Sequence, residues 1–384
     1  MPSIFVILST LGLLFGLFLT YWLHSRVGIS IRLTPSDPPA QAPLLSIIVP
    51  ARNEARNIQR CAAALLDQTY PAIELIVVDD RSTDGTSQIL GQLQSQFSAL
   101  RIVSGTDLPP DWAGKPHALV QGVSAAVGEW LCFVDADTFA GSKLIASAFT
   151  AAQKYNADMF TVLTKQELGS FWEKVVLPLV FTGLSFGFPA EKVNDPNAPE
   201  AIANGQFILV KKEVYDQVGG HASVRDRIDE DKAFAEVVKR AGYRLILADG
   251  SELVSTRMYT SLPELWEGWT KNIFLGLRDR IGLLTFGAFV ALLGAIALPL
   301  WLLVGLLWMH IGGGTPAAIV TIEAIIVWGY LLFQRARASQ YFEISPWYAL
   351  TLPLGAAIFA GMMFASAFNV ITGRGVSWKG RVYT

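Results

Sequence analysis

The chain has 384 residues and is too apolar for an ordinary water-soluble protein, because 52% of its residues are hydrophobic, 16% are charged and the mean hydropathy is +0.40. Residues 38–280 hold 52 of the 62 charged side chains, so a polar block lies between apolar ends. The block carries 23 basic and 29 acidic side chains, which argues against a nucleic-acid partner. Two cysteines, Cys61 and Cys132, provide neither a disulfide framework nor a metal cluster.

The apolar ends predict membrane-spanning helices. Residues 4–23 are uncharged and long enough to cross a hydrocarbon core of about 30 Å. They lack the basic start of a signal peptide, which predicts a retained anchor over residues 1–25. Residues 281–309, 315–334 and 344–373 predict three further spans, and the middle one is interrupted only by Glu323.

The charges beside these spans predict an orientation. Arg26 and Arg32 follow the first span, so the positive-inside tendency places the polar block in the cytoplasm of a multi-pass protein of the cell membrane. Three C-terminal crossings would put the basic tail at 374–384 on the opposite side. Either one segment is re-entrant, with the segment that contains Pro353 as the first candidate, or the tendency fails here.

A proline-rich linker at 26–43 leads into a region where strands and helices alternate. Apolar runs predict strands at 44–49, 74–78, 101–103 and 130–134, separated by helical stretches that end near residue 67 and span 87–97 and 116–126. This alternation predicts an α/β fold with a mostly parallel sheet and a ligand at the carboxyl ends of its strands. Further along, we expect an interfacial apolar segment at 171–189, strands at 208–210 and 244–247, and a helix at 232–241.

Acidic residues follow two of the expected strands. Asp79 and Asp80 end the strand at 74–78, where carboxylates can accept hydrogen bonds from a nucleobase or a ribose. Asp84 could instead only cap the next helix, and Asp79 could only support the turn. Asp135 and Asp137 follow the strand at 130–134, and such oxygen ligands without histidine suit Mg²⁺ or Mn²⁺ on a diphosphate.

A third acidic cluster, at 227–231, precedes the expected helix at 232–241. Its acidic residues could simply stabilise the start of that helix through the helix dipole. Alternatively, one of them is a general base that takes a proton from an acceptor hydroxyl, with Asp231 as the first choice and Glu230 as the second.

Few basic residues could neutralise a diphosphate leaving group. Lys115 follows a glycine in a loop, and Lys271 lies in an aromatic stretch before the C-terminal apolar region. Lys271 could also be an interfacial lysine beside tryptophans. The histidines show no paired ligand spacing for zinc, so we expect each to be structural or exposed. The serine-hydrolase and P-loop motifs do not occur in the sequence.

Four segments in order resemble the signature of family 2 glycosyltransferases with the GT-A fold: SIIVPARNE (46–54), VVDDRSTDGT (77–86), FVDAD (133–137) and DED (229–231). The resemblance covers about residues 44–275. The membrane frame, together with VNDP (193–196), VGGH (218–221) and WKGR (378–381), is similar to membrane-bound members that glycosylate lipids such as hopanoids or carotenoids.

The resemblance implies a role for each matching residue. The nucleotide-sugar would be bound by Pro50, Ala51, Glu54, Asp80, which contacts the base, and Asp135, which faces the ribose. Asp137 would hold a divalent metal, Mg²⁺ or Mn²⁺, on the diphosphate. Asp231 would be the base of an inverting single displacement without a covalent intermediate.

One departure from the family pattern concerns polymer synthesis. Polymer-forming members carry Gln-x-x-Arg-Trp before the membrane, whereas this chain has WEGWTK at 266–271, which leaves Lys271 in place of the arginine. We therefore expect a hexosyltransferase domain at 44–280 that glycosylates a membrane lipid beside transmembrane segments at 281–373. The apolar segments at 171–189 and 266–274 would form the path of the acceptor. The alternatives are a processive polysaccharide synthase and a non-catalytic nucleotide-sugar-binding membrane subunit.

Overall fold

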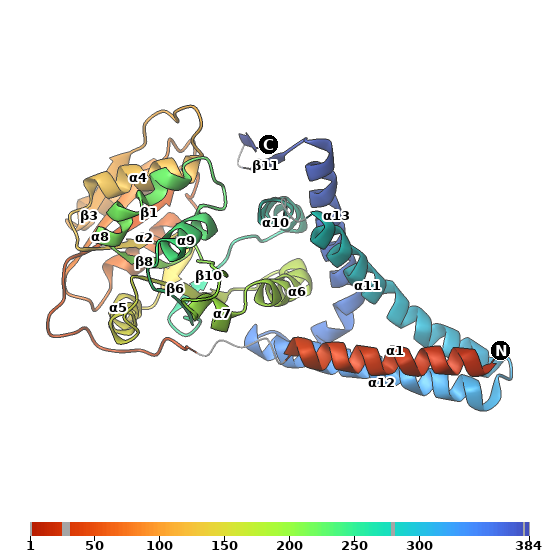
Figure 1. Ribbon diagram of the computed structural model, residues 1–384. Coiled ribbons are helices and arrows are strands. Elements are labelled where there is room, and N and C mark those ends of the chain that lie inside the picture. Colours follow the sequence, from red (N-terminus) through yellow and green to blue (C-terminus); the bar gives the residue numbers. More distant parts are fainter. Residues whose placement is uncertain (1, 25–30, 278–280, 379–380, 384) are drawn as a thin grey trace. The chain divides into compact units, whose positions relative to one another are not determined.

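The computed structural model describes residues 2–24, 31–277, 281–378 and 381–383. Arg26, Lys379 and parts of the predicted anchor, linker, domain and tail lie outside the described residues. The chain divides into a sheet unit, Gly28–Glu167 with Phe188–Met258, and a helical unit, Met1–Val27 with Leu168–Gly187 and Tyr259–Thr384 (Figure 1). Two parts of the predicted 44–280 domain, 168–187 and 259–280, thus pack with the helical unit.

A seven-stranded sheet forms the centre of the sheet unit, in the order β3-β2-β1-β4-β8-β6-β9. Its strands are β1 (Leu45–Ala51), β2 (Ile73–Asp79), β3 (Leu100–Ser104), β4 (Trp130–Phe133), β6 (Met159–Leu163), β8 (Ile208–Lys211) and β9 (Leu245–Asp249). The β3-β2-β1-β4 half is parallel, as predicted, whereas β8 runs antiparallel to both β4 and β6. The described helices of this unit are α2 (Ile58–Leu66), α3 (Thr86–Gln96), α4 (Gly114–Ala125), α5 (Leu144–Lys154), α7 (Ala190–Asn194), α8 (Lys212–Gln217), the 3₁₀ helix η1 (Gly220–Val224) and α9 (Glu230–Arg240).

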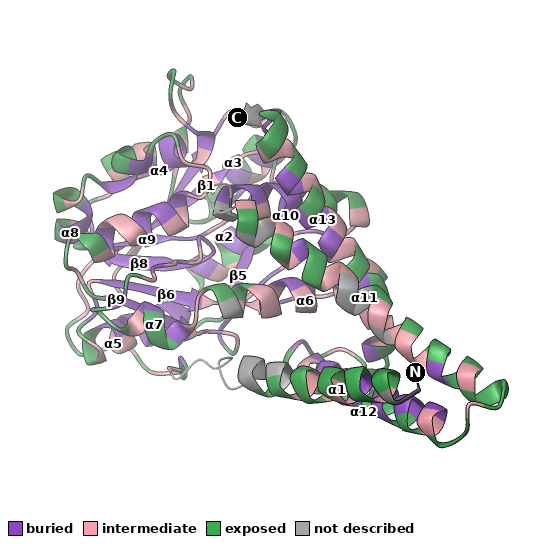
Figure 2. Cartoon of the chain, turned by 45° about the vertical axis from the view of Figure 1, so that its right-hand side comes forward, coloured by how far each residue is buried: buried purple, intermediate pink, exposed green. Residues whose placement is uncertain are grey.

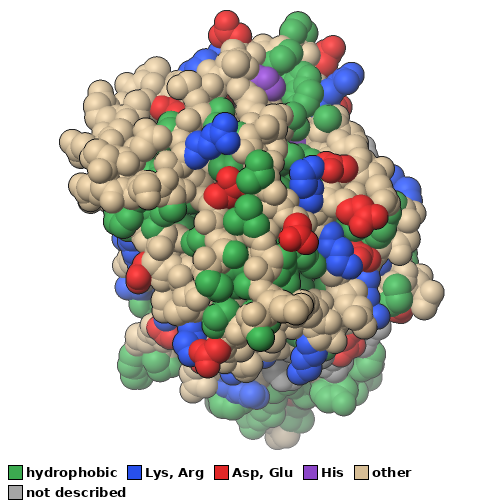
Figure 3. Space-filling model, turned by 90° about the vertical axis from the view of Figure 1, so that its left-hand side faces the viewer, with side chains coloured by type: hydrophobic (Ala, Val, Ile, Leu, Met, Phe, Trp, Pro, Cys, Tyr) green, Lys and Arg blue, Asp and Glu red, His purple; other side chains and the backbone are tan. Residues whose placement is uncertain are grey.

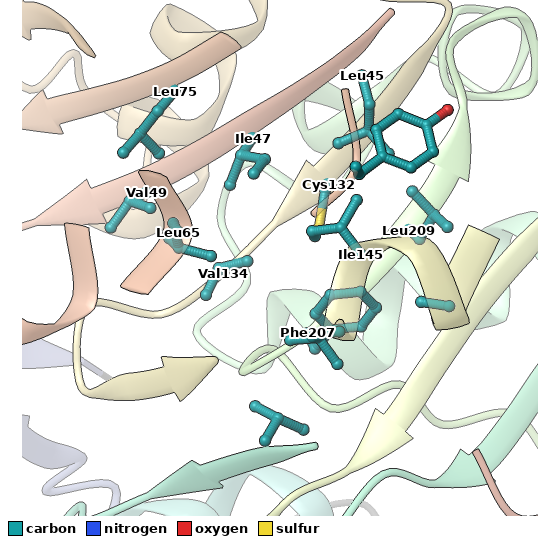
Figure 4. Close-up of a cluster of buried hydrophobic side chains, with 14 of the residues drawn as sticks. Leu45, Ile47, Val49, Leu65, Leu75, Cys132, Val134, Ile145, Phe207 and Leu209 are labelled. Atoms are coloured by element: carbon teal, nitrogen blue, oxygen red, sulfur yellow. The ribbon is translucent and has the colours of Figure 1, made fainter. Parts of the chain in front are cut away.

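Both faces of the main sheet are buried, because successive side chains of a strand point to opposite faces. Ile47 and Val49 of β1 pack with Leu65 of α2 and Ile145 of α5 on one face (Figure 4). Ile48 between them belongs to the cluster on the other face, beside α4 and α9. Continuous apolar runs in the sequence therefore become strands that are covered on both sides.

A small second sheet and the linker complete the sheet unit. The strands β5 (Thr138–Ala140), β10 (Val254–Thr256) and β7 (Lys165–Gln166) form the order β5-β10-β7. The described part of the linker lies along the edge strand β9, where Leu33 N–H donates to Asp249 O at 2.8 Å.

Figure 3 shows acidic and basic side chains intermixed on one face of the molecule.

The helical unit contains α1 (Pro2–His24), α6 (Phe171–Gly187), α10 (Leu262–Leu277), α11 (Ile281–His310), α12 (Gly314–Tyr341), the 3₁₀ helix η3 (Pro346–Thr351) and α13 (Leu352–Thr372), followed by β11 (Val376–Trp378) and β12 (Arg381–Tyr383). Thr10 of α1 donates to a carboxyl oxygen of Glu323 in α12 at 2.6 Å, so this acidic residue holds two apolar helices together. Arg335 of α12 is buried and donates to Lys174 O of α6 at 2.8 Å.

Several helices of this unit expose large apolar side chains, coloured as exposed along α1 and α11 in Figure 2. Among the described residues, two helical segments are long and apolar enough to cross a membrane, Gly314–Tyr341 and Pro346–Thr372. Shorter apolar helical stretches occur at Ile4–Phe18 and Pro299–His310. The predicted interfacial segment at 171–189 forms the helix α6.

Candidate functional site

The candidate site lies at the carboxyl ends of the central parallel strands. Pro50 and Ala51 end β1, Asp79 ends β2, and Asp135 comes shortly after β4. Because these strands are parallel neighbours, their ends meet at one edge of the sheet. The backbone confirms this proximity, since Asp80 N–H donates to Ala51 O at 2.8 Å.

The turn after β2 contains three carboxylates, two of which have structural roles while the third remains a candidate ligand. Asp79 accepts a hydrogen bond from Ser82 N–H at 3.1 Å, and Asp84 accepts from Thr86 N–H at 2.9 Å and from Ala55 N–H at 3.1 Å. The bond to Asp79 shows the turn-supporting role that the sequence allowed for it. Asp84 also supports the turn rather than capping α3, because the N-cap residue of that helix is Gly85.

Asp80 is the exception in this turn, because its side chain is buried beside two cations. Arg52 and Arg81 each place a nitrogen 3.5 Å from a different carboxylate oxygen of Asp80. Arg81 has a left-handed backbone with φ +54°, which is uncommon for a residue other than glycine. The Asp80 side chain is thus held between two arginines at the sheet edge.

A pocket beside this edge is built around the ammonium group of Lys115. It is lined by Pro50, Lys115, Leu119, Phe133, Val134, Asp135, Gly205, Ile208, His221, Glu230 and Asp231. Lys115 Nζ lies 2.7 Å from Asp135 Oδ1 and 2.7 Å from Glu230 Oε1. Burial lowers the pKa of Lys115, but the carboxylates of Asp135 and Glu230 outweigh it and keep that pKa well above its usual value.

Glu230 and Asp231 begin α9 and face this ammonium from the same pocket. Burial, opposed by Lys115, raises the pKa of Glu230 to about 7. Burial also raises the pKa of Asp231, although Lys115 and two backbone N–H groups counteract it. Those donors are Lys232 N–H, 2.7 Å from Oδ1, and Gly205 N–H, 3.0 Å from Oδ2. The Asp231 carboxylate is therefore fixed in orientation, and the burial that raises its pKa makes it a better proton acceptor.

Asp137 lies two residues beyond Asp135, where its backbone carbonyl accepts a hydrogen bond from Thr256 at 3.1 Å. Burial raises the pKa of the Cys61 thiol, and the negative charges of Asp137, Asp135 and Glu54 raise it further. No group of three or more metal-ligating side chains occurs within the described ranges. The oxygen donors fit a Mg²⁺ or Mn²⁺ ion that is held by one carboxylate together with substrate phosphates.

The remaining predicted residues have different positions. Glu54 lies in the turn after β1, where its backbone N–H donates to Thr86 at 2.8 Å and its carboxylate accepts from Asn57 at 3.0 Å. Lys271 does not line the pocket; it is a largely buried residue of α10 in the helical unit. The assignment of Lys271 to the leaving group stays a prediction.

Sequence reasoning missed two residues that line the pocket, Gly205 and His221. A Cβ atom on Gly205 would lie 2.8 Å from Lys115 Nζ and 3.1 Å from Asp231 Oδ2, so only glycine leaves these groups in place. His221 was expected to be structural or exposed, and it is buried against aromatic rings. No motif in the sequence marks Gly205 as a ligand-binding residue. For His221 the one signal was the VGGH segment, which belongs to the family resemblance.

The chain is similar to known glycosyltransferases. Glycosyl transferase family 2 matches residues 46–219. The 4,4'-diaponeurosporenoate glycosyltransferase of Staphylococcus aureus strain USA300 is 29% identical over 261 residues, which cover 65% of this chain and 68% of the relative. Its counterpart from strain MRSA252 is 28% identical over the same length.

A solved structure shares the fold. The mannosyltransferase PcManGT from Pyrobaculum calidifontis, in complex with GDP-Man and Mn²⁺, matches with a TM-score of 0.56 at 18% identity, over 97% of this chain and 100% of that chain. At this identity the likeness concerns the fold alone. Together with the family match, it confirms the predicted GT-A fold.

Proposed function

We propose lipid glycosylation as the function of this chain, which carries a glycosyl transferase family 2 domain and is a glycosyltransferase. The donor is a nucleotide-sugar, and the acceptor is a long apolar molecule of the carotenoid type, as the names of the Staphylococcus aureus relatives suggest. The apolar helices Gly314–Tyr341 and Pro346–Thr372 support a location in the cell membrane with several crossings. The catalytic side would face the cytoplasm, where nucleotide-sugars are made.

The orientation of Asp231 carries the mechanistic part of the proposal. Both of its oxygens accept a backbone N–H, so the carboxylate is held rigidly at the pocket wall. Asp231 takes the proton from the acceptor hydroxyl while the acceptor oxygen forms a bond to the anomeric carbon. The bond from that carbon to the phosphate oxygen breaks in the same step, and its electron pair leaves with the nucleoside diphosphate. One displacement inverts the configuration.

Other residues around the pocket would hold the donor. Pro50, Ala51, Glu54 and Asp80 lie at the strand ends where the nucleoside would bind, and Asp135 would meet the ribose. Asp137 would bind Mg²⁺ or Mn²⁺, which supplies positive charge for the leaving diphosphate when it is bound. Lys115 is close enough to Asp135 to add a second positive charge there.

The relatives are named for an acid, so the group that accepts the sugar in their substrate would be a carboxyl rather than a hydroxyl. A carotenoid acid would carry a carboxyl group that is already ionised at neutral pH, and such an acceptor would not need a base. Replacement of Asp231 would then lower the rate of transfer to a carboxylate acceptor much less than the rate of transfer to a hydroxyl acceptor.

The test uses the full chain in lipid nanodiscs with radiolabelled UDP-glucose, UDP-N-acetylglucosamine and GDP-mannose, each with a bacterial lipid extract. We expect the label from one donor to enter the organic phase as a singly glycosylated lipid. Asp231→Asn should lower this transfer by at least about 100-fold with a hydroxyl acceptor, whereas the exposed control Asp226→Asn should not change it.

Three results would contradict the proposal. Label that remains in the aqueous phase, whether as free sugar or on soluble sugars, would exclude a lipid acceptor. Long carbohydrate products would favour a polysaccharide synthase. Binding of the donor without any turnover would favour a nucleotide-sugar-binding subunit.

A further inference from the structure

His221 is a buried residue among aromatic rings, a position where packing alone would not require a side chain that forms hydrogen bonds. It is only 1% exposed, stacks on Phe234 with ring centroids 4.8 Å apart, and meets Phe133 edge-on at 4.7 Å. It also lines the pocket that contains Lys115 and Asp231. The ring is therefore held by aromatic neighbours and also borders the pocket.

The hydrogen bonds of Tyr215 decide which ring nitrogen carries the proton. The Tyr215 hydroxyl accepts a hydrogen bond from the backbone N–H of His221 at 3.0 Å and lies 3.2 Å from the ring nitrogen Nδ1 of the same residue. Both residues are buried, and among the described residues the hydroxyl has no acceptor other than Nδ1. The hydroxyl proton therefore points to Nδ1, which acts as an acceptor, and the proton of the neutral imidazole sits on Nε2.

The surroundings keep this ring neutral. Burial, reinforced by the positive charge of Lys115, lowers the pKa of His221 to about 3. Among the described residues, Nε2 makes no hydrogen bond to another protein group. His221 thus offers one uncharged N–H donor, and the neighbouring pocket side chains Asp135, Glu230 and Asp231 are acceptors.

We propose that His221 Nε2–H donates a hydrogen bond to a hydroxyl group of the donor's sugar and thereby determines which sugar is bound. A sugar hydroxyl both accepts and donates, so it can accept from Nε2 and donate to one of the pocket carboxylates at the same time. An apolar ring could not donate this hydrogen bond. This inference rests on the proposed function, because it requires a nucleotide-sugar donor.

The experiment measures binding rather than turnover, by calorimetry on the full chain in nanodiscs. The ligands are UDP and GDP, and the matching UDP-glucose and GDP-mannose. His221→Phe keeps an aromatic ring without a donor, His221→Gln places an amide N–H where Nε2 lies, and His221→Asn places its amide near Nδ1. Tyr215→Phe removes the hydroxyl that fixes the tautomer.

We expect His221→Phe and His221→Asn to weaken binding of the nucleotide-sugar about tenfold while the affinity for the nucleoside diphosphate stays within about twofold. His221→Gln should stay within about threefold of the wild type, and Tyr215→Phe should fall between the two. The thermal unfolding midpoint of each variant identifies any that does not fold. If His221→Phe or His221→Asn does not fold, the affinities of His221→Gln and Tyr215→Phe are compared with that of the wild type instead.

The inference is wrong if His221→Phe binds the nucleotide-sugar as tightly as the wild type. It is also wrong if His221→Phe loses the sugar and the bare nucleotide to the same extent, or if Gln behaves like Phe, because these results indicate a packing role. Failure of the wild type to bind any of the four ligands would refute the proposed function itself, and the inference would fall with it.

Discussion

Lys115 Nζ lies 2.7 Å from a carboxylate oxygen of Glu230, a residue at the start of α9 whose side chain is 5% exposed. The same ammonium is 2.7 Å from Asp135, which follows β4. One cation thus joins the two ends of the candidate site, the strand end that would hold the donor and the helix start that would provide the base. The predictions below follow from this arrangement and from the packing that supports it.

Lys115→Met should lower both activity and stability, because it leaves Asp135 and Glu230 facing each other without a cation. Removing one partner of a fully buried ion pair costs about 3 kcal/mol or more, and the cost here should be smaller since 32% of the Lys115 side chain is exposed. Turnover should fall at least about 100-fold. The matched control is Lys211→Met, which breaks a 2.8 Å pair with Asp158 away from the pocket and should leave turnover unchanged. Equal losses of turnover in both variants would contradict the role of Lys115.

Glu230→Gln should change how stability depends on pH. The pKa of Glu230 is about 7 in the folded chain and about 4.5 in the unfolded chain, so the folded state binds its proton more tightly. This stabilisation is complete below about pH 4.5 and is lost as the pH rises through about 7. The unfolding midpoint of the wild type relative to Glu230→Gln should therefore drop between pH 5 and pH 8. Differential scanning fluorimetry at four pH values measures it, and a gap that stays constant or widens toward pH 8 would refute the prediction.

Asp137→Asn should weaken metal-assisted donor binding. An amide oxygen is a poorer ligand for Mg²⁺ or Mn²⁺ than a carboxylate, so the Mn²⁺ concentration that half-saturates UDP-glucose or GDP-mannose binding should rise at least about tenfold. EDTA should abolish turnover of the wild type, and added Mn²⁺ should restore it. The exposed control Asp67→Asn should resemble the wild type. Full activity in EDTA would exclude a role for the metal.

Gly122→Ala should destabilise the sheet unit, because α4 packs directly on β1 at this residue. An added Cβ would lie 2.4 Å from Cγ2 of Ile48 and 3.1 Å from Cγ2 of Val78. Overpacking of this kind costs about 1–3 kcal/mol. Gly91→Ala is the control, since Gly91 is an exposed position of α3 with nothing within 4 Å of the new methyl group, and it should stabilise by up to about 1 kcal/mol. The prediction fails if both variants unfold at the wild-type temperature.

The sequence allowed the parallel half of the sheet to be predicted well. Apolar runs at 44–49, 74–78 and 130–134 became β1, β2 and β4 within two residues at each end, because strands that are buried on both faces need uninterrupted apolar residues. The strands β5, β6, β7 and β10 were not predicted. Three of these are only two or three residues long, and their pairing partners are distant in sequence, so no local pattern specifies them.

Part of the candidate site could also be read from the sequence. Asp135, Glu230, Asp231 and Lys115 were all predicted to act in one site, and the structure brings them to one pocket. Asp80 and Asp137 lie at the same sheet edge without lining that pocket. What no motif revealed is that Lys115 pairs with Glu230, since neither the spacing nor the composition of two distant segments fixes a contact between them.

The sequence by itself determined the strands of the parallel half of the sheet, the apolar helices, and the acidic residues that stand at strand ends and at the start of a helix, because periodicity and turn chemistry are local properties. Only the tertiary structure decided that a glycine N–H orients Asp231, that Lys115 lies between two carboxylates, and that the ring of His221 borders the pocket. Those features depend on the packing of α4, η1 and α9 against one face of the sheet, where burial and nearby charges set the protonation of each group.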